Sequence, residues 1–159
     1  MATKKVQNLL YLGADHRGFQ LKEQIKQFLI KQNISFIDCG DLNYKKDDDY
    51  PDYAKQVAKK VQASKFQSKG LLICGSAEGV CITANKFKGI RAAIVEQKEQ
   101  TELAVKHDHA NVICMPADRV VIKKAKLLVL EFLAAKPSKA QRHVRRINKI
   151  KRIEKQNFK

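Results

Sequence analysis

The stretch LLICGSAEGV, residues 71–80, decides the fold. Its first three residues form a short apolar run between Gly70 and Gly75, which predicts a buried strand of a parallel sheet. The residues after Gly75 predict a turn followed by a helix. Cys74 therefore stands at the carboxyl end of a strand, which is the edge where open α/β sheets bind ligands because helix N-termini face it.

Outward from this stretch, strand-like runs alternate with helical periodicity along the whole chain. Strands are expected at residues 8–13, 35–38, 71–74, 90–95 and 111–115. Helices are expected at residues 18–31, 97–107 and 120–135, and from Pro51 to Val61. A short helix that follows the third strand is expected to end at Ala84, and the segment after Pro137 is also expected to be helical. The class is therefore α/β, and we expect a single Rossmann-like three-layer domain with a five-stranded parallel sheet and a C-terminal helical tail.

Length and composition narrow the classes of protein that this chain can be. With 159 residues, 44% of them hydrophobic, it is long enough for one domain with a sizeable core. No apolar stretch approaches a membrane span and the first residues lack a signal-peptide pattern, so we expect a cytoplasmic protein without membrane contact. The four cysteines are dispersed and form no C-x-x-C pair, so neither disulfides nor a bound metal are expected.

The formal charge of +16 is concentrated near the C-terminus. After Ala135 there are ten basic residues and a single acidic one, Glu154. Such a segment can be a solvated helix, a phosphate-binding element or a nucleic-acid surface. Because the segment holds one aromatic side chain, Phe158, stacking on bases is poorly supported and nucleic acid is an unlikely partner.

The loop at residues 75–79 has the composition of an anion-binding turn. It lacks both the Gly-Lys-Ser/Thr ending of a phosphate-binding P-loop and the glycine spacing of a dinucleotide site, so nucleotide cofactors are disfavoured. Its small residues are expected to let substrate oxygens approach the backbone N–H groups. A helix N-terminus also favours the thiolate, so the pKa of Cys74 is expected to be lowered, as a base or nucleophile requires.

Further candidate groups are expected at the same edge of the sheet. Asp15 and His16 follow the first strand, and His107 comes just before the fifth. Each alone is more often a helix cap or a packing residue than a catalytic one. Their combination with the loop after Cys74 favours an active site.

The chain resembles the ribose-5-phosphate isomerase type B family, which includes the galactose-6-phosphate isomerase subunits. The resemblance spans nearly the whole chain in order and rests on these stretches: GADHRGFQLK (13–22), DYPDYA (49–54), GLLICGSAEGVCITANKFKGIRAAI (70–94), KHDHANV (106–112), DRVV (118–121) and RHVRRI (142–147). It divides the chain into an isomerase domain at 1–150 and a basic C-terminal tail at 151–159.

The resemblance implies aldose–ketose isomerisation of a sugar phosphate through an enediolate, without metal or other cofactor. Cys74 matches the base, His107 the group that opens the sugar ring, and Ser76 a hydroxyl that the family usually supplies from Thr. The remaining matched positions contact substrate: the loop Gly75, Ala77, Glu78 and Gly79 as anion hole, Asp15, His16 and Asp108 at the sugar, and Arg119, Arg142 and Arg146 at the phosphate.

The resemblance also implies a homo-oligomer, a dimer or a tetramer, in which two chains share each site. Cys74 of one chain would then work with His107 and Arg146 of another. The substrate that the resemblance implies is ribose 5-phosphate. The alternatives are a hexose or tetrose phosphate, and a catalytically idle relative that binds nucleic acid through its basic tail.

Besides Ser76, the chain departs from the family pattern at other positions of the site, among them Ala77, Glu78 and Asp108. Asp108 replaces a usual Asn, and an ionised carboxylate accepts hydrogen bonds where the amide could also donate them. Ala77 replaces a usual glycine, so a positive φ is expected to be unfavourable there. Glu78 is unusual in this loop and is either a solvated carboxylate at the helix start or a second base.

Overall fold

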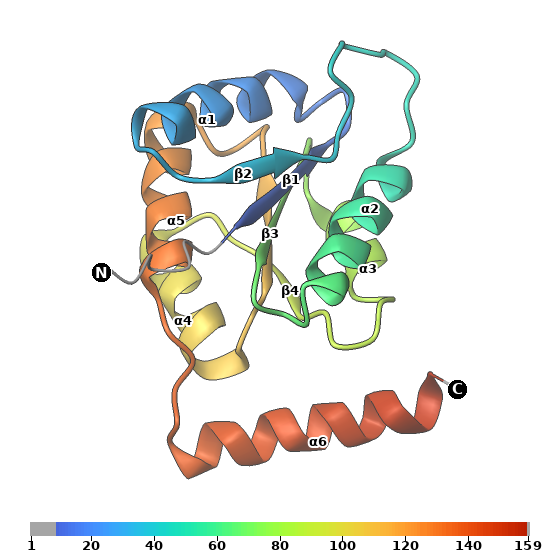
Figure 1. Cartoon of the computed structure of the whole chain (residues 1–159), viewed down its shortest axis with the longest axis vertical. Coiled ribbons are helices and arrows are strands. Elements are labelled where there is room, and N and C mark those ends of the chain that lie inside the picture. Colours follow the sequence, from blue (N-terminus) through green and yellow to red (C-terminus); the bar gives the residue numbers. More distant parts are fainter. Residues whose placement is uncertain (1–8, 159) are drawn as a thin grey trace, which may run out of the picture.

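The computed structural model describes residues 9–158, so the predicted start of the first strand at Asn8 and the amino-terminal segment lie outside it. Within these residues a five-stranded sheet runs in the order β2-β1-β3-β5-β4, with every neighbouring pair parallel (Figure 1). The strands are β1 (Leu10–Ala14), β2 (Phe36–Asp38), β3 (Lys69–Cys74), β4 (Ala92–Ile94) and β5 (Val112–Pro116). The helices are α1 (Phe19–Lys31), α2 (Tyr50–Ala63), α3 (Glu78–Ala84), α4 (Lys98–Asp108), α5 (Ile122–Ala134) and α6 (Gln141–Asn157). The predicted fold class is confirmed.

The sheet is covered on both faces because side chains along each strand alternate between two apolar layers. In β3, Leu71 and Ile73 pack with α1, α4 and α5, whereas Leu72 and Cys74 pack with α2 and α3. These two helix groups lie on opposite sides of the sheet in Figure 1. Both layers are fully buried at β3, which explains the uninterrupted apolar run in the sequence.

The order of the strands fixes where ligands can bind. The chain passes from β1 to β2 on one side and then to β3 on the other side of β1, so the strand order reverses between β1 and β3. Loops leaving these two strands diverge and open a crevice at their carboxyl ends. Asp15 and Cys74 stand at the two strand ends that border this crevice.

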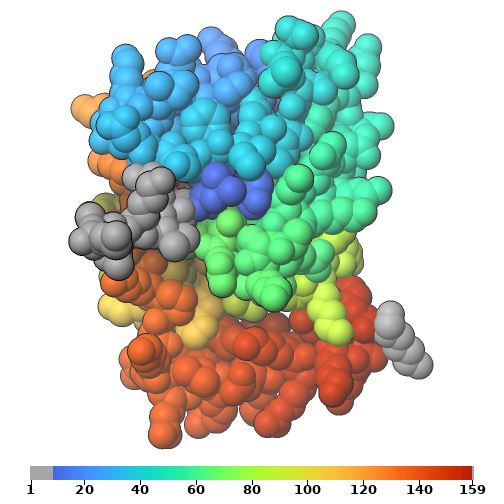
Figure 2. Space-filling model, in the orientation of Figure 1, coloured from blue at the N-terminus to red at the C-terminus, as the bar shows by residue number. Residues whose placement is uncertain are grey.

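Helix α6 packs across the opposite end of the sheet and forms a continuous band in the space-filling view (Figure 2). Its His143 and Ile147 are buried, and the Glu154 carboxylate accepts a hydrogen bond of 2.6 Å from the Gly89 backbone N–H. The helix runs without interruption past Ile150, so the predicted boundary between domain and tail falls inside one helix. None of the helices in residues 9–158 has the length and apolar content that a bilayer span requires.

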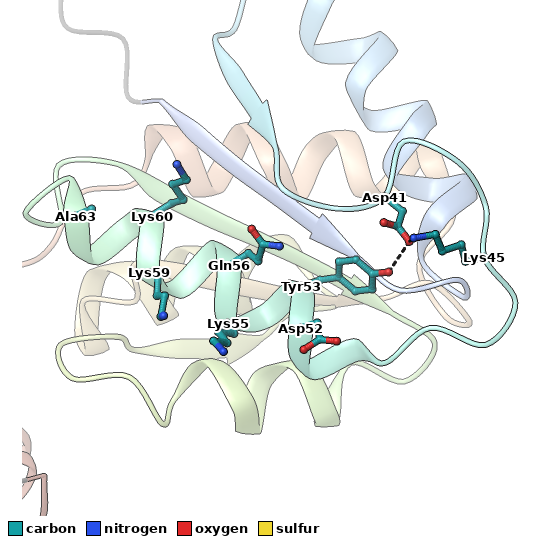
Figure 3. Close-up of a pocket in the computed structure, with 9 residues that line it drawn as sticks. All are labelled: Asp41, Lys45, Asp52, Tyr53, Lys55, Gln56, Lys59, Lys60 and Ala63. Atoms are coloured by element: carbon teal, nitrogen blue, oxygen red, sulfur yellow. Dashed lines mark hydrogen bonds and ion pairs between the residues drawn. The ribbon is translucent and has the colours of Figure 1, made fainter.

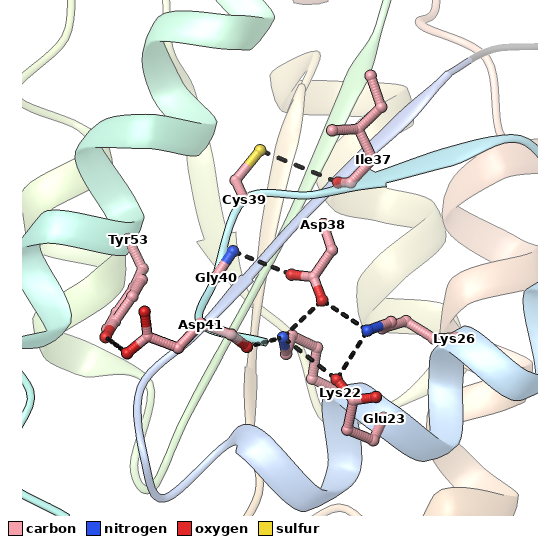
Figure 4. Close-up of polar contacts among 9 residues, drawn as sticks. All are labelled: Lys22, Glu23, Lys26, Ile37, Asp38, Cys39, Gly40, Asp41 and Tyr53. Atoms are coloured by element: carbon pink, nitrogen blue, oxygen red, sulfur yellow. Dashed lines mark hydrogen bonds and ion pairs between the residues drawn. The ribbon is translucent and has the colours of Figure 1, made fainter. Parts of the chain in front are cut away.

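A buried lysine ties α1 to the chain that leaves β2 (Figure 4). Lys22 has no exposed side-chain surface, and its ammonium group donates to Asp38 Oδ2 at 2.6 Å and to the Asp41 carbonyl at 2.9 Å. Asp38 also accepts from the more exposed Lys26, at 2.8 Å. Tyr53 of α2 donates to the Asp41 carboxylate at 2.7 Å, so the network connects α1, the β2–α2 loop and α2.

We predict that Lys22→Met destabilises the fold by roughly 2 kcal/mol or more, because it leaves buried acceptors of the network without their donor. Urea unfolding followed by circular dichroism measures this loss. Lys26→Met removes a partly exposed partner of the same Asp38 and is expected to cost about 1 kcal/mol or less. Equal losses in the two variants would contradict the special role of the buried ammonium group.

Candidate active site

The centre of the candidate site is a hydrogen bond between the ends of β1 and β3. The Cys74 thiol donates to Asp15 Oδ2 at 2.9 Å, and both residues are buried, with 8% and 4% of their surface exposed. The other oxygen of Asp15 accepts the Gly18 backbone N–H at 3.0 Å, which orients the carboxylate at the start of α1. The structure thus joins two of the residues that the sequence singled out.

The predicted lowering of the Cys74 pKa is wrong for this state of the chain. Burial, then the hydrogen bond and charge of Asp15, raise the pKa of the Cys74 thiol to about 12. Hydrogen bonds from the backbone N–H groups of Gly75 and Ala77 act in the expected direction, toward the thiolate, but are outweighed. The free chain therefore holds Cys74 as a thiol at neutral pH.

The loop after Cys74 contains a strained backbone conformation at Ala77 that we did not expect from the sequence. Ala77 takes φ +73° directly before α3, although its methyl group was expected to make a positive φ unfavourable. Its side chain is fully buried against the α2 and α3 layer, which holds the strained conformation in place. The turn therefore keeps the shape that a glycine would take more easily.

The side chains of Arg17 and Tyr50 cover the two glycines of this loop, Gly75 and Gly79. The sequence analysis had assigned no role to either side chain. A Cβ on Gly75 would lie 2.4 Å from Arg17 Nε, and one on Gly79 would lie 2.6 Å from the Tyr50 ring. The small residues thus make room for Arg17 and Tyr50, two neighbours that the expected approach of substrate oxygens did not include. Both residues stand inside stretches that carried the family resemblance, and that was the signal available for them.

His16 is oriented by a carboxylate from the charged β2–α2 loop. Asp48 Oδ1 accepts the His16 backbone N–H at 3.0 Å and lies 2.6 Å from the ring Nδ1. Asp15, His16 and Asp48 place ligand-type atoms within 4.8 Å of one another, the spacing of a possible metal site. Both oxygens of Asp15 and Oδ1 of Asp48 already have hydrogen-bond partners within the chain.

Glu78 behaves as a solvated carboxylate at the start of α3. A hydrogen bond from Ser76, then its own backbone N–H and Arg119, lower the pKa of this exposed carboxyl. Arg119 Nη2 lies 3.8 Å from Glu78 and 2.8 Å from Glu96. Of the two interpretations, the ionised helix-start carboxylate is the one the geometry favours.

His107 does not lie at the edge that holds Cys74, contrary to the sequence-based expectation. Gly70, four residues before Cys74, pairs with Val112 at the start of β5, and His107 and Asp108 end the helix that precedes this point. Four residues of strand span about 13 Å. Arg142 and Arg146 share the His107 end, because the His143 ring between them lies 4.2 Å from that of His107.

The chain also has a hollow of about 690 Å³ over the outer face of α2, shown in Figure 3. None of the site residues predicted from the sequence line it. The lining residues are Asp41, Lys45, Asp52, Tyr53, Lys55, Gln56, Lys59, Lys60 and Ala63. The candidate site is therefore the open crevice between β1 and β3, and this hollow is separate from it.

A doubly covered parallel sheet that places a thiol, a carboxylate and the backbone N–H groups of Gly75 and Ala77 at its switch point has the features of an α/β enzyme that handles anionic intermediates. The chain belongs to the ribose/galactose isomerase family, whose model matches residues 10–150.

Individual relatives agree with this assignment. The chain is 40% identical over 147 residues to a probable ribose-5-phosphate isomerase B of Mycoplasma genitalium, covering 92% of this chain and 96% of the relative. It is 37% identical to ribose-5-phosphate isomerase B of Escherichia coli, over 89% of this chain and 93% of that one. The crystal structure of the Mycoplasma genitalium enzyme with bound ribulose-5-phosphate superposes with a TM-score of 0.87 at 39% identity, covering 92% of this chain and 96% of that one.

We predict that Asp15→Asn speeds alkylation of Cys74 by iodoacetamide at pH 8 several-fold, because losing the neighbouring negative charge lowers the thiol pKa. In the unmodified chain Cys74 is expected to react at least about tenfold more slowly than an exposed thiol. Peptide mass spectrometry resolves each cysteine, and Cys39 serves as an internal reference whose rate Asp15→Asn leaves unchanged. Cys74 reacting fastest of all in the unmodified chain would refute the raised pKa.

Proposed function

We propose that this chain interconverts ribose 5-phosphate and ribulose 5-phosphate. The observation that carries the proposal is the Cys74–Asp15 pair at the switch point, adjoining a loop of backbone N–H donors. Family membership, relatives named ribose-5-phosphate isomerase B and the ribulose-5-phosphate bound to one of them support the same reaction. The substrate is a five-carbon sugar phosphate, with a hexose or tetrose phosphate as the alternative because Asp108 departs from the family pattern.

The reaction moves one proton between two neighbouring carbons. The Cys74 thiolate removes the proton from the hydroxyl-bearing carbon next to the carbonyl, and the released electron pair forms the enediolate. The N–H groups of the loop at residues 75–79 hold the negative oxygen, and Ser76 offers a hydroxyl beside it. The Cys74 thiol then returns the proton to the former carbonyl carbon. The hydroxyl proton of the neighbouring carbon passes to the negative oxygen, so that the new carbonyl forms and the ketose results.

The reaction requires deprotonation of the Cys74 thiol, which the raised pKa of this group makes unfavourable at neutral pH. The pKa of Cys74 is about 12, so the thiolate is a minor form in the free chain at neutral pH. The N–H groups of Gly75 and Ala77 already stabilise it, and Asp15 is the acceptor that holds its proton. Activity on this scheme rises with pH, since each step up in pH increases the thiolate fraction.

A second copy of the chain completes the site in this proposal. Within one chain His107, Asp108, Arg142 and Arg146 lie at the other end of the sheet from Cys74, so they cannot reach a sugar held there. Arg142 and Arg146, with His107, form a cationic group suited to a phosphate dianion. A homo-oligomer in which α6 of one copy faces the crevice of another brings the two halves together.

The proposed reaction needs neither a metal nor another cofactor, because backbone donors stabilise the oxyanion. We place it in the cytoplasm, whose reducing conditions suit a chain with four free cysteines, Cys39, Cys74, Cys81 and Cys114.

An assay of ribose 5-phosphate beside hexose and tetrose phosphates tests the substrate and the base together. We expect turnover of ribose 5-phosphate to exceed that of the others and to survive EDTA. Cys74→Ala is expected to lower kcat at least about a thousandfold with the fold retained, because it removes the base. Cys39→Ala, a half-buried cysteine outside the site, should keep full activity. Near-normal turnover by Cys74→Ala would reject the cysteine as base.

Mixing two inactive variants tests the shared site. Cys74→Ala and Arg146→Ala chains, dissociated and reassembled together, are expected to regain up to about a quarter of the unmodified activity, since half of the mixed dimers' sites combine an intact Cys74 with an intact Arg146. Each variant reassembled alone is the control and should stay inactive. If mass spectrometry shows mixed oligomers while activity stays absent, the site lies within one chain.

A further inference from the structure

Arg17 bridges the two loops on either side of the loop at residues 75–79. It follows His16 in the turn after β1, and its Nη2 donates to Asp118 Oδ2 at 2.6 Å. Asp118 belongs to the turn after β5, and β1 and β5 are the two neighbours of β3 in the sheet. The ion pair therefore passes over the end of β3, where Cys74 and Gly75 stand.

The guanidinium group of Arg17 lies directly on Gly75. The three atoms nearest to a Cβ built on this glycine all belong to Arg17: Nε at 2.4 Å, Cζ at 2.8 Å and Cδ at 2.9 Å. Asp118 also holds Gly75, because its backbone N–H donates to the Gly75 carbonyl at 3.0 Å. The two residues of the ion pair thus both contact Gly75, one through its guanidinium group and the other through its backbone.

The exposure of this ion pair argues against a role in global stability. The Arg17 and Asp118 side chains are 57% and 44% exposed, and exposed pairs contribute little to folding free energy. Their effect is local, because the backbone they hold carries N–H donors for the Cys74 sulfur. A small displacement of such donors costs little in stability and much in transition-state stabilisation.

We propose that Arg17 is a positioning residue of the isomerase: its planar guanidinium group, anchored by Asp118, presses the Gly75 peptide into the orientation in which the loop N–H groups meet the developing negative charge. This inference rests on the proposed function. It assigns Arg17 to the transition state rather than to binding of the ground-state phosphate, because its guanidinium group lies on Gly75 and already donates through Nη2 to Asp118.

Steady-state kinetics separate positioning from substrate binding. Arg17→Ala and Arg17→Gln are expected to lower kcat about tenfold or more while KM changes less than about threefold. Asp118→Asn should act in the same direction. Arg17→Lys should recover only part of the lost kcat, because lysine keeps the positive charge but lacks the planar guanidinium group. Lys31→Ala, an exposed basic residue at the end of α1, is the control with unchanged kcat. A rise in KM with kcat unchanged would make Arg17 a ground-state phosphate ligand and overturn the proposal.

A double-mutant cycle tests the contact without any turnover. Gly75 does not have a positive φ, so an alanine there meets crowding by Arg17 rather than backbone strain. Gly75→Ala is expected to lower Tm clearly in the unmodified chain and markedly less in Arg17→Ala, where the guanidinium is gone. Equal losses in both backgrounds would show that Arg17 does not lie on Gly75 and would overturn the proposal. Absence of isomerisation by the unmodified chain would instead reject the proposed function, while this cycle still decides the contact.

Discussion

The hydrogen bond between Cys74 and Asp15 is the point on which the site depends. It exists because β1 and β3 pair in parallel with Ala14 opposite Ile73, so that the residues following each strand emerge side by side. A shift of one residue in this register would turn Cys74 to the other face of the sheet and separate the pair. The apolar alternation of β3 between two covered faces excludes that shift, so the packing of the core also sets the chemistry.

Three loops surround the Cys74–Asp15 pair: the turn after β1, the β2–α2 loop and the turn after β5. Different contacts hold each of them in place. Buried Lys22 holds the start of the β2–α2 loop, and the far end of that loop supplies Asp48 to His16. Asp118 brings the turn after β5 onto Gly75. The site is therefore a product of tertiary contacts over long sequence separations.

These long-range contacts also set the limit of what could be predicted from the sequence. Hydrophobic periodicity located the strands and helices of the described residues to within about three residues, because each element carries its own pattern. Asp15 and Cys74 could be brought together from the rule that parallel strand ends share an edge. The same rule misplaced His107, since a helix returning to the sheet ends at the opposite edge. The raised pKa of Cys74, the positive φ of Ala77 and the place of Arg17 depend on burial and close approach, which no local pattern encodes.

The position of α6 has an electrostatic consequence. Carboxylates gather at the crevice end of the sheet, among them Asp15, Asp48, Glu78, Glu96 and Asp118, whereas α6 at the other end carries seven basic residues and one acidic one. These carboxylates and the bases of α6 thus lie at opposite ends of the strands, although the chain as a whole is strongly positive. When α6 of one copy approaches the crevice of another, its bases come close to these carboxylates, and salt weakens such attractions beyond a Debye length of about 8 Å. Salt also weakens the repulsion between two positively charged chains, so the encounter of two copies depends on the ionic strength.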